Sequence, residues 1–185
     1  MGVASVSLSK LWPALTAVGA LSLIMFSAFK THLILTDIDY NPDHVTRSRG
    51  TYSIQMDPSG GSRMHTRGRY TYGTFSAFLK CPAGNFTGLV STFYISSLEG
   101  SLDQDEIDFE FLGKSPAMIQ TNYWVNGQGG DREQMVGLGF DCRSAFHKYT
   151  IQWTISYIKW FIDDELVRKA INDGYSPWPT KPSFV

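Results

Sequence analysis

The chain has 185 residues, a formal net charge of −1 at pH 7 and 14% aromatic residues. This length suits one domain with a sizeable core and excludes two full domains. The near-neutral charge, without a block of Lys or Arg, removes any broad electrostatic attraction to nucleic acid or to an anionic membrane surface.

Residues 11–29 form an apolar run without a charge, bounded by Lys10 and Lys30. Such a run directs a chain to a membrane or to the secretory pathway. At about 1.5 Å per residue it just spans a bilayer core. The small-residue pattern of a cleavage site is incomplete, because Phe26 lies two residues before Ala28. We therefore expect residues 1–32 to be either a cleaved signal peptide or an uncleaved membrane anchor.

Two further features bear on the secretory route. Asn85-Phe86-Thr87 fits the N-glycosylation acceptor pattern and lies in a turn-forming stretch, so Asn85 is a candidate glycan acceptor. Cys81 and Cys142 are the two cysteines. They form either one bridge, which needs Cα atoms within about 7 Å, or two separate buried thiols.

After the apolar run, we expect a polar connector over residues 33–50 and a folded domain over residues 51–185. Short alternating segments separated by Gly and Pro turns predict an all-β sandwich or jelly roll. The stretch 165–171 fits either a helix or a strand. The expected strands are residues 51–56, 69–80, 89–96, 105–112, 117–124, 134–140, 147–153 and 158–162.

The most informative segment is Asp105-Glu106-Ile107-Asp108-Phe109-Glu110. On a strand, alternate side chains share a face, so Glu106, Asp108 and Glu110 project together while the apolar residues between them face a core. Aligned like charges repel and raise one another's pKa, so a fold that keeps them usually uses them for acid/base chemistry or for a cation.

The spacing favours chemistry on a sugar. The Cα atoms of Glu106 and Glu110 lie about 13 Å apart along a strand. Side chains that lean together can close this gap to the roughly 5–5.5 Å between the two carboxyl groups of a retaining glycosidase. The alternatives are a solvated acidic strand face and a Ca²⁺ site, although a regular strand presents its oxygens too far apart for Ca²⁺. We expect no metal and no cofactor.

The segment from Asp105 to Gly113 resembles glycoside hydrolase family 16, and specifically its plant xyloglucan endotransglucosylase/hydrolase branch. The resemblance covers roughly residues 50 to 180. Further matches follow in the expected order: Thr92 to Ser97, Gln120-Thr121-Asn122, Arg132-Glu133-Gln134 and Phe146 to Trp153.

The resemblance implies a concanavalin-like β-jelly-roll sandwich, a polysaccharide substrate such as xyloglucan or mixed-linkage glucan, and an extracellular or cell-wall location. It implies Glu106 as the nucleophile, Asp108 as the assisting acid and Glu110 as the acid/base. It also places on the glycan groove Gln120, Thr121, Asn122, Asp131, Arg132 and Glu133. Tyr94 and Trp124 could stack on sugars, but core packing is the better expectation. His147 is expected to be a structural hydrogen-bonding residue.

Three departures from the branch pattern modify this picture. Leu138-Gly139-Phe140-Asp141 lacks the branch's tryptophan, an aromatic residue that could hold an acceptor sugar, and Lys114-Ser115-Pro116 replaces its sequon. The chain also stops before the family's last strands, so the jelly roll is expected to be incomplete at its C-terminus. The competing hypothesis is a truncated, inactive carbohydrate-binding relative held at a membrane.

Overall fold

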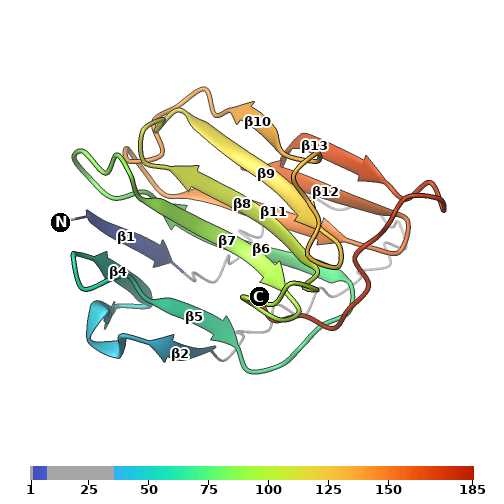
Figure 1. The fold of residues 1–185 in the computed structure, drawn as a ribbon. Helices are drawn as coiled ribbons and strands as arrows, with labels where there is room; N and C mark the ends of the chain where they lie inside the picture. Colours follow the sequence, from blue (N-terminus) through green and yellow to red (C-terminus); the bar gives the residue numbers. More distant parts are fainter. Residues whose placement is uncertain (1, 8–35) are drawn as a thin grey trace, which may run out of the picture.

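The computed structural model describes residues 2–7 and 36–185, which form strands and one short 3-10 helix (Figure 1). This confirms the all-β expectation. The elements are β1 (Gly2–Ser7), β2 (Thr36–Tyr40), η1 (Pro42–His44), β3 (Val45–Ser48), β4 (Thr51–Met56), β5 (Arg63–Thr66), β6 (Gly73–Lys80), β7 (Val90–Ser96), β8 (Glu106–Leu112), β9 (Met118–Trp124), β10 (Gln134–Gly137), β11 (His147–Trp153), β12 (Tyr157–Ile162) and β13 (Glu165–Ile171).

Two antiparallel sheets build the body of the molecule (Figure 1). The larger sheet has the strand order β13-β12-β11-β6-β1-β4-β3, and the smaller one has the order β10-β9-β8-β7. A separate pair, β2 and β5, lies beside them. β8 therefore has a hydrogen-bonded neighbour on each side, which fixes its register.

The core lies between the two sheets, because each sheet carries apolar side chains on its facing surface. Phe109 and Phe111 of β8 pack edge-on against Tyr149 of β11, with ring centroids 5.5 and 4.8 Å apart. Trp153 and Trp160 of the larger sheet complete this layer and are almost fully buried. The apolar face of β8 is thus fixed against the larger sheet, and its other face is left for the carboxylates.

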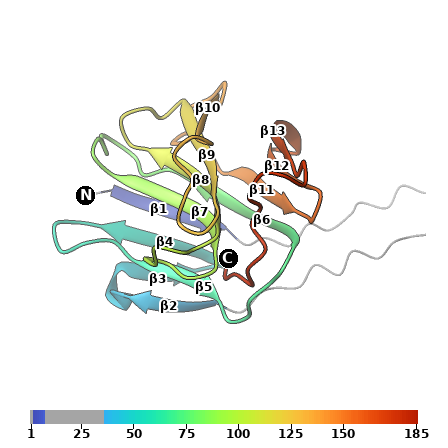
Figure 2. The same cartoon turned by 45° about the vertical axis from the view of Figure 1, so that its right-hand side comes forward.

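A buried carboxylate, Asp105, anchors the start of β8. Its Oδ2 atom accepts backbone N–H groups of Thr180 at 2.8 Å and Lys181 at 3.1 Å, and its Oδ1 atom accepts that of Asn126 at 3.1 Å. The segment after β13 thereby runs past the start of β8 (Figure 2). Because Glu106 follows Asp105 directly, these bonds fix the backbone from which Glu106 projects.

Cys81 and Cys142 form a disulfide, with Cα atoms 5.3 Å apart. The backbone N–H of Cys81 also donates to the carbonyl of Cys142 at 2.9 Å. Of the two arrangements that the sequence left open, the structure has the bridge. It links the end of β6 to the segment before β11.

Replacing both cysteines with serine is expected to lower the free energy of unfolding by about 2–4 kcal/mol, because the bridge closes a long loop in the unfolded chain. The two residues are 61 positions apart. Urea unfolding of the oxidised wild type and the double variant measures the difference. The wild type in reductant is the control and should unfold like the variant; equal stability of all three samples would contradict the expectation.

Several expected boundaries are corrected. The connector expected over residues 33–50 is wrong for residues 36–48, which form β2, η1 and β3. Their polar side chains reflect exposed strands rather than a linker. β6 begins at residue 73, and β10 ends at residue 137, shortly before Gly139 takes a φ of +73°. Residues 165–171 form a strand, β13.

The signal or anchor expected over residues 1–32 remains a prediction, since most of that segment, including residues 11–29, lies outside the described residues. Gly2–Ser7 of the segment pairs with β4 and β6 in the larger sheet. Within residues 2–7 and 36–185, no helix has the length and hydropathy needed to cross a membrane.

Candidate active site

The acidic strand face predicted from the sequence is present on β8. Ile107 and Phe109 are almost fully buried against the larger sheet, so Glu106, Asp108 and Glu110 project from the opposite face. The register places polar and aromatic side chains directly beside them: Thr92, Tyr94 and Ser96 on β7, and Gln120, Asn122 and Trp124 on β9.

The three carboxyl groups differ in burial and therefore in proton affinity. Asp108 is only 1% exposed, and burial together with the charges of Glu106 and Glu110 raises its pKa to about 8. Burial, and then the charges of Glu110 and Glu99, raise the pKa of Glu106 to about 7. Burial and Glu133 also raise the pKa of Glu110. Near neutral pH the face consequently holds protons that isolated carboxyl groups would have lost.

Asp108 is the group best suited to stay neutral. Its Oδ1 atom is buried and has no hydrogen-bond partner among the described residues. A buried carboxylate oxygen without a donor strongly favours the protonated form. At neutral pH the residue between the two glutamates is therefore an uncharged carboxylic acid and not a third negative charge.

The two glutamates have different neighbours. Glu106 Oε2 accepts a hydrogen bond from Gln104 Nε2 at 2.8 Å, and such a donor stabilises an ionised carboxylate and fixes its orientation. Glu110 instead lies near Glu133, whose negative charge favours a protonated Glu110. Gln120, opposite Glu110 in register, donates to Glu133 at 2.5 Å. The two ends of the face thus have different surroundings: a hydrogen-bond donor orients Glu106, and a second carboxylate favours a proton on Glu110.

The structure separates the predicted groove residues into two groups. Gln120 and Asn122 lie on the acidic face, and Glu133 contacts it through Gln120. Thr121 points into the core and is fully buried, so its assignment to the groove is wrong: on a strand it must face away from Gln120 and Asn122.

Arg132 turns away from the acidic face, and Asp131 extends into solvent. The Arg132 guanidinium donates to the carbonyl of Gln128 and lies 5.0 Å from the ring of Tyr123, which alternates with Asn122 and so projects from the core side of β9. The Asp131 side chain is 87% exposed. The groove assignment is therefore wrong for Arg132 in this structure, and Asp131 is a solvent-exposed group on the turn.

The aromatic expectations are reversed. Tyr94 lies opposite Asp108 and Trp124 opposite Glu106, both half-buried on the acidic face rather than in the core. Burial raises the pKa of the Tyr94 phenol to about 12. Both rings are placed where sugar rings could stack. The structural role expected of His147 is confirmed, since its Nδ1 pairs with Asp163 at 2.6 Å in the larger sheet.

Three supporting residues were not found from the sequence. Gln104 could have been found, because it continues the alternation of residues 106, 108 and 110. Trp160 donates its indole N–H to the Asp108 carbonyl at 2.9 Å, and Arg168 hydrogen-bonds the backbone of β9 from β13. No local pattern reveals these last two contacts, because they join strands that are distant in sequence.

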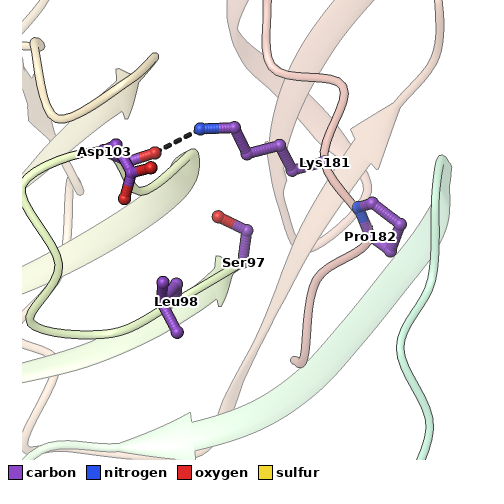
Figure 3. Close-up of a pocket in the computed structure, with 5 residues that line it drawn as sticks. All are labelled: Ser97, Leu98, Asp103, Lys181 and Pro182. Carbon is purple, nitrogen blue, oxygen red and sulfur yellow. Dashed lines mark hydrogen bonds between the residues drawn. The ribbon is translucent and has the colours of Figure 1, made fainter.

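A pocket of about 300 Å³ lies near the loop that precedes β8 (Figure 3). Lys181 crosses it and donates to the Asp103 carbonyl. The lining residues are Ser97, Leu98, Asp103, Lys181 and Pro182. The three carboxylates do not line this pocket. Among residues 2–7 and 36–185, no group of three or more His, Cys, Asp or Glu side chains is arranged to hold a metal ion.

Residues 35–185 match the glycosyl hydrolases family 16. This chain belongs to that family. Family 16 relatives among plant proteins include a xyloglucan endotransglucosylase/hydrolase of Brassica oleracea var. botrytis, 38% identical over 68% of this chain and 43% of its own length. A probable xyloglucan endotransglucosylase/hydrolase protein 21 of Arabidopsis thaliana is 34% identical over 82% of this chain and 53% of its own length. The chain thus spans about half the length of the curated relatives it matches.

Solved family 16 structures identify the architecture as the expected jelly roll. A Bacillus licheniformis β-glucanase is 27% identical, with a TM-score of 0.68 over 83% of this chain and 77% of that chain. A prokaryotic β-1,3-1,4-glucanase (lichenase) derived from a mouse hindgut metagenome is 30% identical, with a TM-score of 0.67 over 83% of this chain and 78% of that chain.

Proposed function

We propose that this chain carries the catalytic face of a retaining, endo-acting glycoside hydrolase or transglycosylase that acts on β-1,4-linked plant cell-wall glucans, xyloglucan or mixed-linkage glucan. The observation that carries the proposal is the face of β8, on which Glu106, Asp108 and Glu110 lie together with raised pKa values. The printed names of the plant relatives and of the lichenase support the substrate class.

The proposed mechanism is a double displacement. Glu106 attacks the anomeric carbon, the glycosidic C–O bond breaks, and the proton of Glu110 passes to the leaving oxygen. Glu110 then takes a proton from water or from a sugar hydroxyl, whose oxygen displaces Glu106 with net retention of configuration. Asp108 holds a proton between them and so limits the charge repulsion on the face. Gln104, which donates to Glu106, supports its role as the nucleophile.

Hydrolysis is the favoured outcome of the second step. Gly139 lies beyond the Glu110 end of the sheet, because β10 pairs Gly137 with Met118 at the start of β9. It has a positive φ and no side chain that could hold an acceptor sugar. Water then competes more easily with a sugar hydroxyl for the covalent intermediate.

A reducing-end assay on xyloglucan and on mixed-linkage glucan, run with and without a labelled acceptor oligosaccharide, tests the proposal. We expect new reducing ends on at least one substrate and little label in long products. A folded sample that releases no reducing ends and transfers no label would refute the enzyme function. Extensive labelling would instead identify a transglycosylase.

We further propose that the chain passes through the secretory pathway, with the apolar run of residues 11–29 as its signal or anchor. The Cys81–Cys142 bridge supports this route, since disulfides persist in oxidising compartments. Asn85 is exposed, and its Oδ1 accepts the backbone N–H of Thr87, so the acceptor sequence lies in an accessible turn. A glycosidase-induced mobility shift that disappears in Asn85→Gln would test the modification.

A further inference from the structure

Arg168 is a buried cation that the proposed mechanism does not use. It lies on β13 and is only 7% exposed. Among the described residues, no Asp or Glu oxygen lies within 4.0 Å of it. Burying a guanidinium without an ion-pair partner costs several kcal/mol unless other groups accept its hydrogen bonds. The groups that do so indicate what Arg168 holds in place.

These acceptors lie on β9, in the sheet that carries the acidic face, and on the turn that joins β9 to β10. Arg168 Nη1 donates to the carbonyl of Thr121 and, at 2.9 Å, to its hydroxyl, while Nη2 donates to the carbonyl of Arg132 at 2.5 Å. The guanidinium lies 4.5 Å from the ring of Trp160, which in turn donates to the Asp108 carbonyl. Arg168 thus joins β13, β9 and the turn between β9 and β10.

The contact at Arg132 leads directly to the acidic face. Glu133 follows Arg132 in the chain and accepts the side-chain hydrogen bond of Gln120, which lies opposite Glu110. The position of the Arg132 carbonyl therefore limits where the Glu133 carboxylate can lie. A shift of this turn away from β9 would separate Glu133 from Glu110.

We propose that Arg168 is a positioning residue: by holding the Arg132 carbonyl and Thr121 from the opposite sheet, it fixes the β9–β10 turn so that Glu133 stays beside Glu110. This inference rests on the proposed function, in which Glu110 is the proton donor. A lysine could keep the positive charge at this position, but its single nitrogen could not span both backbone sites as the planar guanidinium does.

The charged and titratable groups around Glu110 define what must be measured. Glu106 and Asp108 share its strand, and Glu133 approaches from the turn; farther along the face, Tyr94 lies opposite Asp108, and Glu99 acts on Glu106. Carboxyl ¹³C NMR can follow the titration of Glu110 in the whole protein, with its signal identified by its loss in Glu110→Gln. This measurement needs no turnover, so it tests the inference even if no glucan is cleaved.

We expect Arg168→Lys to lower the pKa of Glu110 by about half a pH unit, because Glu133 moves away while the positive charge stays. Glu133→Gln should lower it in the same direction, and the double variant should show no further fall. An unchanged Glu110 titration in Arg168→Lys, or additive falls in the double variant, would overturn the proposal. In a sample that cleaves glucan, the pH at which kcat/KM falls on the alkaline side should shift by the same amount as the pKa of Glu110.

Two companion variants keep the test decisive. Arg143→Lys alters a partly exposed arginine that pairs with Asp141 and should leave the Glu110 titration unchanged. Thr121→Val removes one acceptor of Arg168 while preserving shape, and should lower the pKa of Glu110 by a smaller amount. If Arg168→Lys fails to fold, Thr121→Val decides: a fall supports the proposal, and an unchanged titration overturns it.

Discussion

Glu106→Ala is expected to lower kcat/KM on the cleaved glucan by about 10⁴-fold, because the variant lacks the group that forms the covalent intermediate. The fold should persist, since Glu106 is half-buried on the open face and lies outside the core between the sheets. Initial rates with reducing-end detection, and a thermal melt of the same sample, measure the two properties together.

Azide distinguishes the roles of the two glutamates. In Glu106→Ala, azide can enter the space left by the carboxylate and attack the anomeric carbon of an activated glycoside once, giving a glycosyl azide of inverted configuration. In Glu110→Ala, azide should intercept the covalent intermediate and give the retained configuration. If the two products are exchanged, the assigned roles are exchanged as well.

The matched control is Glu165→Gln, because Glu165 is an exposed glutamate on β13 of the larger sheet. It should leave the rate within about twofold of the wild type, as expected for an exposed surface substitution. Activity that survives in Glu106→Ala at the level of this control would exclude Glu106 as the nucleophile.

Local sequence patterns were sufficient to predict the face on which a side chain lies wherever this depends on alternation along one strand. The alternation of Glu106 with Ile107 predicted the acidic face, and the same rule could have excluded Thr121, which lies between two groove residues and must face the core. The family resemblance assigned Gln120, Thr121 and Asn122 together to the glycan groove and did not distinguish the two faces of their strand. The strand geometry does separate them.

Contacts between distant strands could not be predicted in this way. Arg168 reaches Thr121 across 47 positions of the sequence, and Trp160 reaches Asp108 across 52. Each contact depends on how the two sheets are packed together, which no local pattern specifies. β2 and β3 were missed for the opposite reason: their polar, exposed side chains lack the apolar alternation by which strands are recognised.

Asp108→Asn is expected to change stability in a pH-dependent way. Burial and two neighbouring glutamates raise the pKa of Asp108 in the folded protein to about 8, far above its ordinary value. The folded state therefore keeps this proton to a higher pH than the unfolded chain does. Stability falls as pH rises through that window, because the folded state binds more protons there. Below about pH 4 both states are protonated, and the penalty is absent.

The asparagine variant has no such proton to lose. Its amide introduces a donor into a buried position where Oδ1 has no partner among the described residues, at a cost of about 1–3 kcal/mol at every pH. Between about pH 4 and pH 8, its free energy of unfolding should rise relative to the wild type by on the order of 5 kcal/mol. The variant should thus be the less stable protein in acid and gain on the wild type toward pH 8.

Calorimetric melts of both proteins at about pH 4.5, 6 and 8 measure how the stability difference changes with pH. Asp131→Asn is the control, because the Asp131 side chain is exposed. The control should show a constant difference from the wild type. A difference that is equally constant for Asp108→Asn would mean that Asp108 does not retain its proton. A rising difference, accompanied by a loss of activity of about 10²-fold, would show that the protein keeps a destabilising acid between its two glutamates because the chemistry requires it.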